Sequence, residues 1–279
     1  MKIYTHNMED IRKSFFKSNV ENWFEVDGLP IALDDWFTNI SIDLSGGADS
    51  ALMAYLLMTE LKKRNVPDIT NPGNIQGCKV HLIYHHRGWK TKPWQIDVAN
   101  RVIEWLNNYY PVTVHRNFIP EKYEDYNLIG EKRTAEYVEI DEYRKYLVES
   151  IGIDMHYNAT TSHYPFASRA DEYENRNREE IDPYQFIHYK NIEAQPFLYI
   201  TKDWIVKQYI DHNIMDLFNL TRSCEGNVQL FKYQANDGII DDFDYKKGDN
   251  ISVTCNQCYW CEERNWAIEQ NKNDKIVCT

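Results

Sequence analysis

The fold of this chain is decided by the stretch ISIDLSGGADS, residues 40–50. Residues 40–44 are a short stretch with β-branched isoleucines, which is typical of a buried strand. Residues 49–64 (DSALMAYLLMTELKKR) are rich in helix formers and end in basic residues, as the last turn of a helix prefers. The sequence therefore predicts a strand and a helix joined by a glycine-containing turn.

The same alternation continues outward from this stretch. Helix 91–108 is expected to carry Ile96, Val102, Ile103 and Leu106 on its apolar side. Strand–helix alternation predicts an α/β fold, an open and mostly parallel twisted sheet with helices on both faces. The other predicted strands are 80–84, 112–114 and 155–160, and the other predicted helices are 134–150 and 202–213.

Composition shifts divide the chain into three predicted parts. Residues 1–38 are an N-terminal helical extension, with an amphipathic pattern from Ile11 to Val20 and a break at Gly28. Residues 39–215 are expected to form the α/β domain, in which the polar segment 161–192 is a lid or substrate loop. Residues 216–279 form a C-terminal module with an inserted hairpin.

Residues 45–50 have the composition of an anion-binding loop. Paired glycines allow positive φ and close backbone approach, so that several N–H groups can face one anion. The following helix adds its positive dipole end. Asp49 is unusual beside phosphates unless it caps the helix or meets a metal ion. We therefore predict that Ser45, Gly46, Gly47, Ala48, Asp49 and Ser50 bind the phosphates of a nucleotide.

Four of the six cysteines form a second pattern. Cys255, Cys258 and Cys261 follow one another at CxxC spacing, and Cys224 precedes them. Four thiolates can close a tetrahedral Zn²⁺ site of structural type. The same ligands also suit an iron–sulfur cluster, and unmetallated structural cysteines remain a third interpretation.

Composition excludes several classes of protein. The chain has 279 residues with 31 Lys plus Arg against 43 Asp plus Glu, so its net charge is −12. This balance disfavours binding to long nucleic acid through its phosphates. No run of about 20 apolar residues predicts a membrane span. The N-terminus lacks the apolar core of a secretory signal, so we expect a cytoplasmic protein with reduced thiols.

The SGGxDS string resembles the pyrophosphate loop of the N-type ATP pyrophosphatases, enzymes that transfer AMP from ATP and release pyrophosphate. Together with the cysteine pattern, it is most similar to the 7-cyano-7-deazaguanine synthase family. Further matching stretches are QPFLYITKDWIV at 195–206, LTRSC at 220–224 and CEER at 261–264.

This resemblance implies an ATP-dependent carbon–nitrogen ligase. The family activates 7-carboxy-7-deazaguanine as an acyl-adenylate with ATP and Mg²⁺. Ammonia then displaces AMP to give the amide, and a second activation dehydrates the amide to the nitrile. The physical reason for activation is that a carboxylate has only oxide as its leaving group, whereas AMP leaves readily.

The resemblance also implies roles for individual residues. Tyr84 and His85 would lie near adenine or ribose, while Lys202 and Arg133 would contact phosphate. Ser45, Asp49 and Lys202 would be the catalytic set. Residues 157–166 would approach the deazaguanine ring, and Zn²⁺ would be held by Cys224, Cys255, Cys258 and Cys261.

Some regions depart from the family pattern. The sequence YHHRG at 84–88 stands where the family has an aspartate, tyrosine, glycine, glutamine run, and KRT at 132–134 replaces an arginine–asparagine element. Both regions are expected to face the substrate. The resemblance to the synthase family implies queuosine biosynthesis, and divergent relatives of the synthase occur in phage DNA modification and anti-phage systems. Some of them stop at the amide or conjugate another amine.

Two other functions stay open at this point. A sulfur or lysine transferase acting on tRNA uses the same loop, but it would need a basic surface to bind RNA. A non-enzymatic nucleotide-binding regulator would not need the loop serines. The sequence does not set the oligomeric state, and a homodimer stays open.

Overall fold

The computed structural model describes residues 20–64, 77–87, 95–119, 129–162, 184–186, 192–223 and 259–272. Its strands are β1 (Trp23–Val26), β2 (Leu29–Ala32), β3 (Asn39–Asp43), β4 (Lys79–Arg87), β5 (Val112–Ile119), β6 (Met155–Tyr157), β7 (Tyr184–Phe186) and β8 (Ile192–Ala194). Its helices are α2 (Ala48–Arg64), α3 (Gln95–Tyr109), α4 (Ile129–Ile151), α5 (Lys202–Asp211), α6 (Met215–Leu220) and α8 (Tyr259–Asn271).

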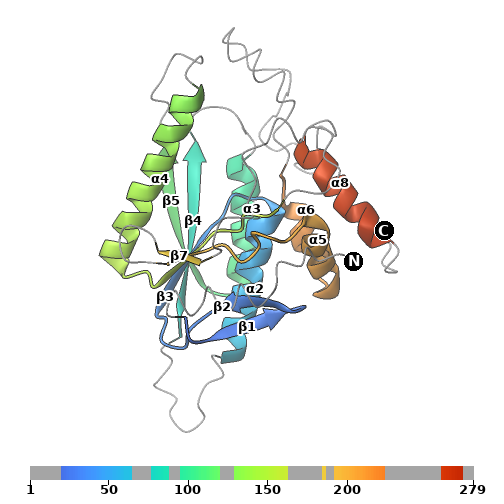
Figure 1. The fold of residues 1–279 in the computed structure, drawn as a ribbon, viewed down its shortest axis with the longest axis horizontal. Helices are drawn as coiled ribbons and strands as arrows, with labels where there is room; N and C mark the ends of the chain where they lie inside the picture. The colour runs from blue at the N-terminus through green and yellow to red at the C-terminus, as the bar shows by residue number, and fades with distance from the viewer. Residues whose placement is uncertain are drawn as a thin grey trace.

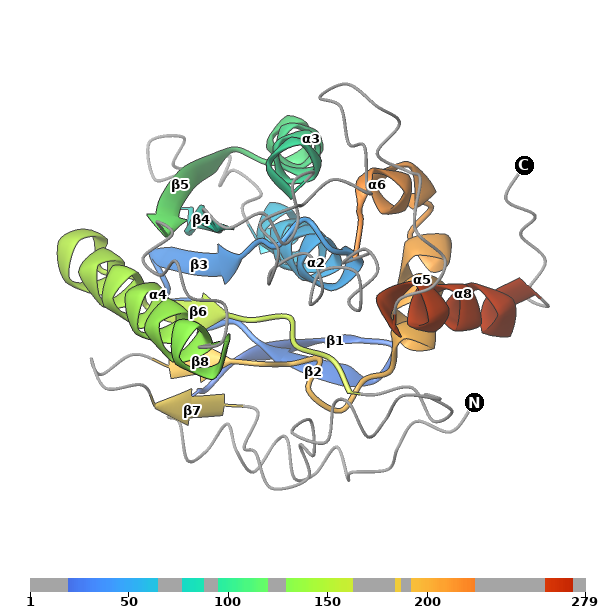
Figure 2. The same ribbon diagram turned by 90° about the horizontal axis from the view of Figure 1, so that it is seen from above.

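The central sheet has the strand order β5-β4-β3-β6-β8-β7 (Figures 1 and 2). The first five of these strands run parallel, and β7 pairs antiparallel with β8. Helix α4 lies on one face of the sheet, and α2 and α3 lie on the other (Figure 1). The predicted α/β fold class, a mostly parallel sheet covered on both faces, is confirmed.

The order of the strands reverses at β3. From β3 the chain moves outward through β4 to β5, and it then returns to add β6 on the other side of β3. In open α/β sheets this reversal opens a crevice at the carboxyl ends of the two strands that flank it. The turn after β3, which carries the predicted phosphate loop, therefore begins at this crevice.

Helix α2 is the centre of the apolar core. Between residues 48 and 58 every side chain except Asp49 is buried. Such a helix must be enclosed on all sides. The sheet, α3 and α5 enclose it, and α8 packs in turn against α5. The hydrophobic run in α2 thus reflects its interior position.

The elements near the loop follow the sequence prediction, and the strand lengths do not. β4 and β5 extend to Arg87 and Ile119 because they pair along that whole length. β6 ends early, at Tyr157. On α3 the predicted apolar residues Val102, Ile103 and Leu106 are buried, but Ile96 is 37% exposed. The placement of Ile96 in the core was wrong.

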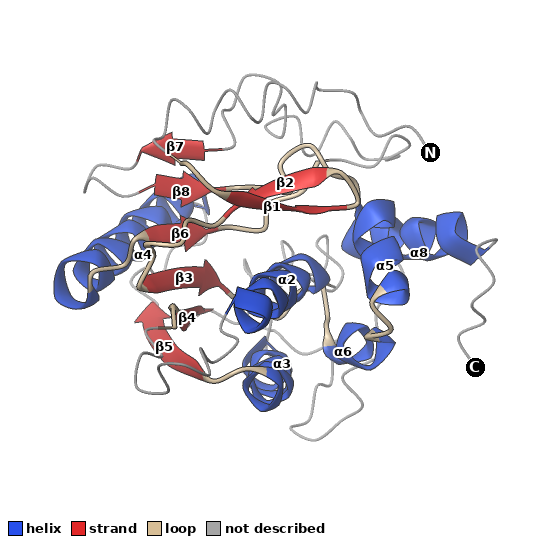
Figure 3. Cartoon of the chain, turned by 90° about the horizontal axis from the view of Figure 1, so that it is seen from below, coloured by secondary structure: helices blue, strands red, loops and turns tan. Residues whose placement is uncertain are grey.

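Residues 23–32 form a hairpin within the segment where a helical extension was expected. β1 and β2 pair antiparallel, and the turn residues Asp27 and Gly28 have φ of 49° and 82°. Two consecutive positive φ angles are typical of a tight hairpin turn. The break predicted at Gly28 is this turn. Figure 3 shows the hairpin beside α2, and the predicted helix from Ile11 lies outside the described residues.

Within the described ranges, no helix is long and apolar enough to cross a membrane.

Candidate functional site

The predicted phosphate loop lies between the end of β3 and the start of α2. Leu44 keeps the strand geometry, since its N–H donates to the carbonyl of Ile83 on β4 at 2.8 Å. Gly46 then turns the chain with φ of 80°. A Cβ at Gly46 would lie 3.0 Å from Val98 Cγ1 and 3.3 Å from the Ala99 nitrogen on α3. Both the conformation and the packing therefore require glycine at this position.

The hydroxyls of Ser45 and Ser50 shape the loop from inside. Their oxygens are 3.1 Å apart, and the Ser50 hydroxyl accepts the Ser45 N–H at 3.2 Å. The Gly47 N–H donates to Ser45 Oγ at 3.2 Å. Ser45 is exposed and Ser50 is buried. Ser45 is thus accessible to a ligand, whereas Ser50 braces the turn.

Asp49 and Lys202 are brought together although they lie 153 residues apart in the chain. Lys202 Nζ donates to Asp49 Oδ1 at 2.5 Å and also contacts Oδ2. Lys202 is 1% exposed, and its Nζ lies 3.8 Å from a carboxylate oxygen of Glu263 on α8. The lysine cancels the charge that made Asp49 unusual beside phosphates. In this geometry Lys202 acts on the loop through Asp49.

The segment after α6 closes over the loop, which the sequence did not reveal. The Arg222 N–H donates to the carbonyl of Gly46 at 3.0 Å. Arg264 on α8 holds the same segment, since it donates to Thr221 Oγ1 at 3.0 Å and to the carbonyl of Phe218 at 3.0 Å. Its guanidinium also lies 3.8 Å from the centre of the Phe218 ring. Burial lowers the pKa of Arg264 to about 10.

Tyr84 and His85 do not lie at the carboxyl end of their strand, because β4 continues to Arg87. Tyr84 is 2% exposed and belongs to the interior. His85 points to the face that α4 covers, with Nε2 3.4 Å from Asp43 Oδ1 and Nδ1 3.2 Å from the Asn117 amide nitrogen. The predicted contact of these two side chains with adenine or ribose stays a prediction. Arg133 lies in α4, and its side chain is outside the described part.

A buried charge cluster fills the α4 side of the sheet. Asp43 receives the Arg144 guanidinium and lies 3.3 Å from His156 Nε2, while Arg144 lies 3.8 Å from Glu193. Burial alone would raise the pKa of Asp43, but Arg144 and His156 hold it well below the usual value. Asp43, the last residue of β3 and two positions before Ser45, is thus anchored as a carboxylate. No sequence motif indicated this cluster.

The four-cysteine site stays a prediction. Cys224, Cys255 and Cys258 lie outside the described residues, and Cys261 is buried in the first turn of α8. Among the residues that the structure describes, no group of three or more His, Cys, Asp or Glu could hold a metal ion. Elsewhere, burial raises the pKa of Cys78 to about 12, so that thiol is unreactive at neutral pH.

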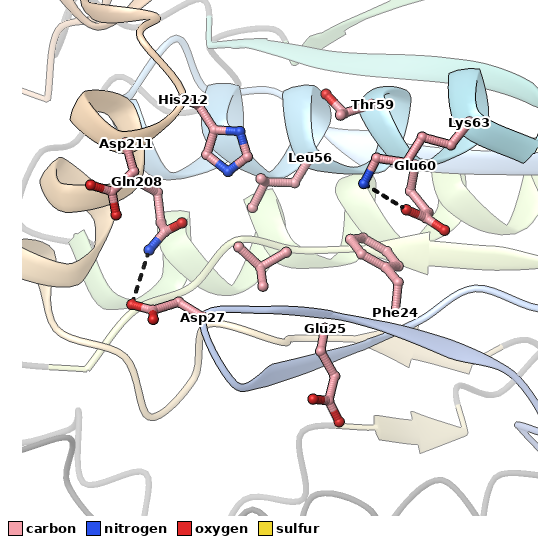
Figure 4. Close-up of a pocket in the computed structure, with 11 residues that line it drawn as sticks. Phe24, Glu25, Asp27, Leu56, Thr59, Glu60, Lys63, Gln208, Asp211 and His212 are labelled. Carbon is pink, nitrogen blue, oxygen red and sulfur yellow. Dashed lines mark hydrogen bonds and ion pairs between the residues drawn. The ribbon is translucent and has the colours of Figure 1, made fainter.

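A cavity of about 310 Å³ lies between β1, the second half of α2 and the end of α5 (Figure 4). Phe24, Leu56 and His212 line it, with Asp27 and Gln208 at one end. The α2 residues that line this cavity begin at Leu56, while the loop lies at the opposite end of α2. The cavity is therefore separate from the candidate nucleotide site.

Comparisons with known proteins assign no family to this chain. No protein-family model and no curated protein match the sequence. Among solved structures, the U34-tRNA thiolase NcsA from Methanococcus maripaludis, with its [4Fe-4S] cluster, is similar with a TM-score of 0.47 and 13% identity. The match covers 93% of this chain and 87% of the thiolase chain. A likeness this weak carries no argument about what this chain binds or does.

Proposed function

We propose that this chain is an ATP-dependent enzyme that joins a carboxylic acid to AMP and releases pyrophosphate. The observation that carries the proposal is the turn after β3. Its Gly46 has positive φ, its Ser45 hydroxyl is exposed, and it opens onto the N-terminus of α2 beside the β3/β6 crevice. Such a site favours an anion through its N–H groups and the helix dipole.

The loop residues supply binding and orientation. Ser45 and the backbone of residues 46–48 would hold the β- and γ-phosphates and meet the charge that develops on departing pyrophosphate. Lys202 keeps Asp49 neutralised, so that the carboxylate does not repel these phosphates. Mg²⁺, when bound with the nucleotide, would neutralise further phosphate charge. Asp49 does not offer a free oxygen to Mg²⁺ in this geometry, because Lys202 engages both of its carboxylate oxygens.

The finer proposal follows from the resemblance of the sequence to the deazaguanine synthases. The acid would be 7-carboxy-7-deazaguanine. Its carboxylate oxygen attacks the α-phosphorus and pyrophosphate leaves. Ammonia attacks the acyl carbon, AMP leaves, and the amide forms. A second ATP-dependent activation removes the amide oxygen to give the nitrile. Zn²⁺ at the four cysteines would have a structural role.

The test has two arms. Wild-type protein is incubated with ATP, Mg²⁺, ammonia and 7-carboxy-7-deazaguanine, and the products are followed by mass spectrometry. We expect AMP, pyrophosphate and the amide or nitrile. Ser45→Ala should lower pyrophosphate release at least about tenfold, because one hydrogen bond to a charged group is lost.

Other outcomes are informative. Accumulation of ADP would refute the proposal, since cleavage would then occur at the γ-phosphate. AMP formation with a different acid or amine would keep the adenylation and replace the substrate. Pyrophosphate release that requires tRNA would favour a tRNA-modifying enzyme, the alternative that the net charge of −12 disfavours.

A further inference from the structure

The space beside Gly47 is flanked by two hydroxyls from distant parts of the chain. A Cβ built on Gly47 would lie 3.2 Å from Ser45 Oγ and 3.4 Å from Ser223 Oγ. Both oxygens thus lie near one point that the missing side chain leaves open. The φ of Gly47 is not positive, so its backbone conformation does not require glycine. What glycine provides here is room between the two hydroxyls.

Ser223 follows two residues that are anchored by hydrogen bonds, one to the loop and one to α8. The preceding residue, Arg222, donates its N–H to the carbonyl of Gly46 at 3.0 Å. Thr221 is 4% exposed and is bonded by Arg264 from α8. Ser223 itself is only partly buried. The Ser223 hydroxyl is therefore accessible, and its backbone is already positioned at the loop. Such preorganisation lowers the entropy cost of binding a ligand.

We propose that Ser223 is a second hydroxyl ligand of the phosphate cradle, and that it donates to the pyrophosphate end of the nucleotide together with Ser45. This inference rests on the proposed function, because it places the triphosphate in the same loop. It adds a contact from the chain after α6, which the loop motif does not contain. The AMP end of the nucleotide makes no contact with Ser223 in this arrangement.

The test measures binding of inorganic pyrophosphate, ATP and AMP by titration calorimetry, with Mg²⁺ present. Ser223→Ala should weaken binding of pyrophosphate and ATP about tenfold, which is the loss of one hydrogen bond to a charged group, and leave AMP unchanged. Gly47→Ala should weaken pyrophosphate binding similarly, since its methyl group would fill the space between the hydroxyls. Ser223→Thr, which retains the hydroxyl, should bind more tightly than Ser223→Ala.

The matched control is Ser150→Ala at the exposed end of α4, where the hydroxyl donates to the carbonyl of Tyr146. It should bind all three ligands as the wild type does. If Ser45→Ala loses pyrophosphate while Ser223→Ala and Gly47→Ala bind as the wild type does, the inference about Ser223 is overturned and the function stands. If the wild type binds neither ATP nor pyrophosphate, the proposed function falls and this inference with it. Should Ser223→Ala fail to fold, Ser223→Cys takes its place, because a thiol has nearly the size of the hydroxyl but is a weak donor, and it should also bind pyrophosphate more weakly than the wild type.

Discussion

At the scale of single residues, the pairing of the partly buried Asp49 with the buried Lys202 explains an acid in the candidate phosphate loop. A carboxylate one residue from the cradle would repel the substrate if it were alone. Lys202 removes that charge, and Glu263 lies within 3.8 Å of the same ammonium. Two carboxylates lie around one buried ammonium, so the three groups together carry an excess of negative charge and no positive charge is left over. The pair is therefore a structural unit as well as an electrostatic one.

Removing one member of this unit should be costly. Lys202→Met leaves two carboxylates without their cation, and breaking a buried pair in this way costs about 3–5 kcal/mol. Lys207→Met is the matched control, because Lys207 lies on the same helix with its side chain 28% exposed and pairs with Asp211 at the surface. A surface pair contributes up to about 1 kcal/mol. Urea unfolding of the two variants measures the difference, and equal stability would show that Lys202 is not a buried partner.

At the scale of elements, polar contacts join neighbouring strands beneath α4. His81 on β4 donates from Nε2 to the Asn39 side-chain oxygen on β3 at 3.2 Å. Its Nδ1 must then accept from His115 Nε2 on β5, 2.8 Å away. This chain of bonds needs a neutral His81. Burial, with the nearby His115 and Lys79, lowers the pKa of His81 to about 4.

The three-strand contact should make the protein sensitive to mild acid. The pKa of His81 is about 4 in the folded chain against about 6.5 when unfolded. Between these values only the unfolded chain binds the proton, so stability is complete above about pH 6.5 and falls as the pH drops towards about 4. The loss is at most about 3 kcal/mol. Urea unfolding at about pH 7 and about pH 5 measures it, and His81→Gln should flatten the slope. An equally steep slope in that variant would assign the effect to other groups.

The apolar periodicity of a helix does not by itself show how wide its buried face is. The apolar spacing of helix 91–108 located Val102 and Leu106 in the core, but it placed the exposed Ile96 there too. Helical spacing defines a stripe, whereas the width of the buried stripe depends on what the helix packs against. For β4, the sequence predicted a strand at residues 80–84. It did not show that Tyr84 faces the α2 side and His85 the α4 side, since that depends on which helices cover each face.

At the scale of the whole molecule, α8 connects the C-terminal part of the chain to the loop. Its Glu263 lies near Lys202, and its Arg264 holds the segment that carries Ser223. Cys261, one of the four predicted metal ligands, lies in the first turn of the same helix. Whatever orders the start of α8 therefore also supports the candidate nucleotide site.

Loss of the predicted metal should lower the stability of the protein and weaken the candidate phosphate site through α8. Wild-type protein should contain about one zinc ion per chain, and Cys258→Ser should lose it, because a tetrahedral site needs all four ligands. The variant should melt at a lower temperature and bind pyrophosphate more weakly than the control Cys278→Ser. Elemental analysis and thermal melting check this. Iron and sulfide in place of zinc would change the assignment to a cluster, and a metal-free wild type of full stability would remove the site altogether.

The sequence by itself determined the strand, the glycine turn and the helix of residues 39–64, and with them the fold class. These depend on consecutive residues: the side-chain period of each element, and the missing side chain of Gly46. Only the tertiary structure decided that Lys202 cancels Asp49, that Ser223 reaches Gly47 and that Tyr84 is buried. The physical reason is that such contacts join residues far apart in the chain, and strand order and the packing of α5 and α8 bring them together.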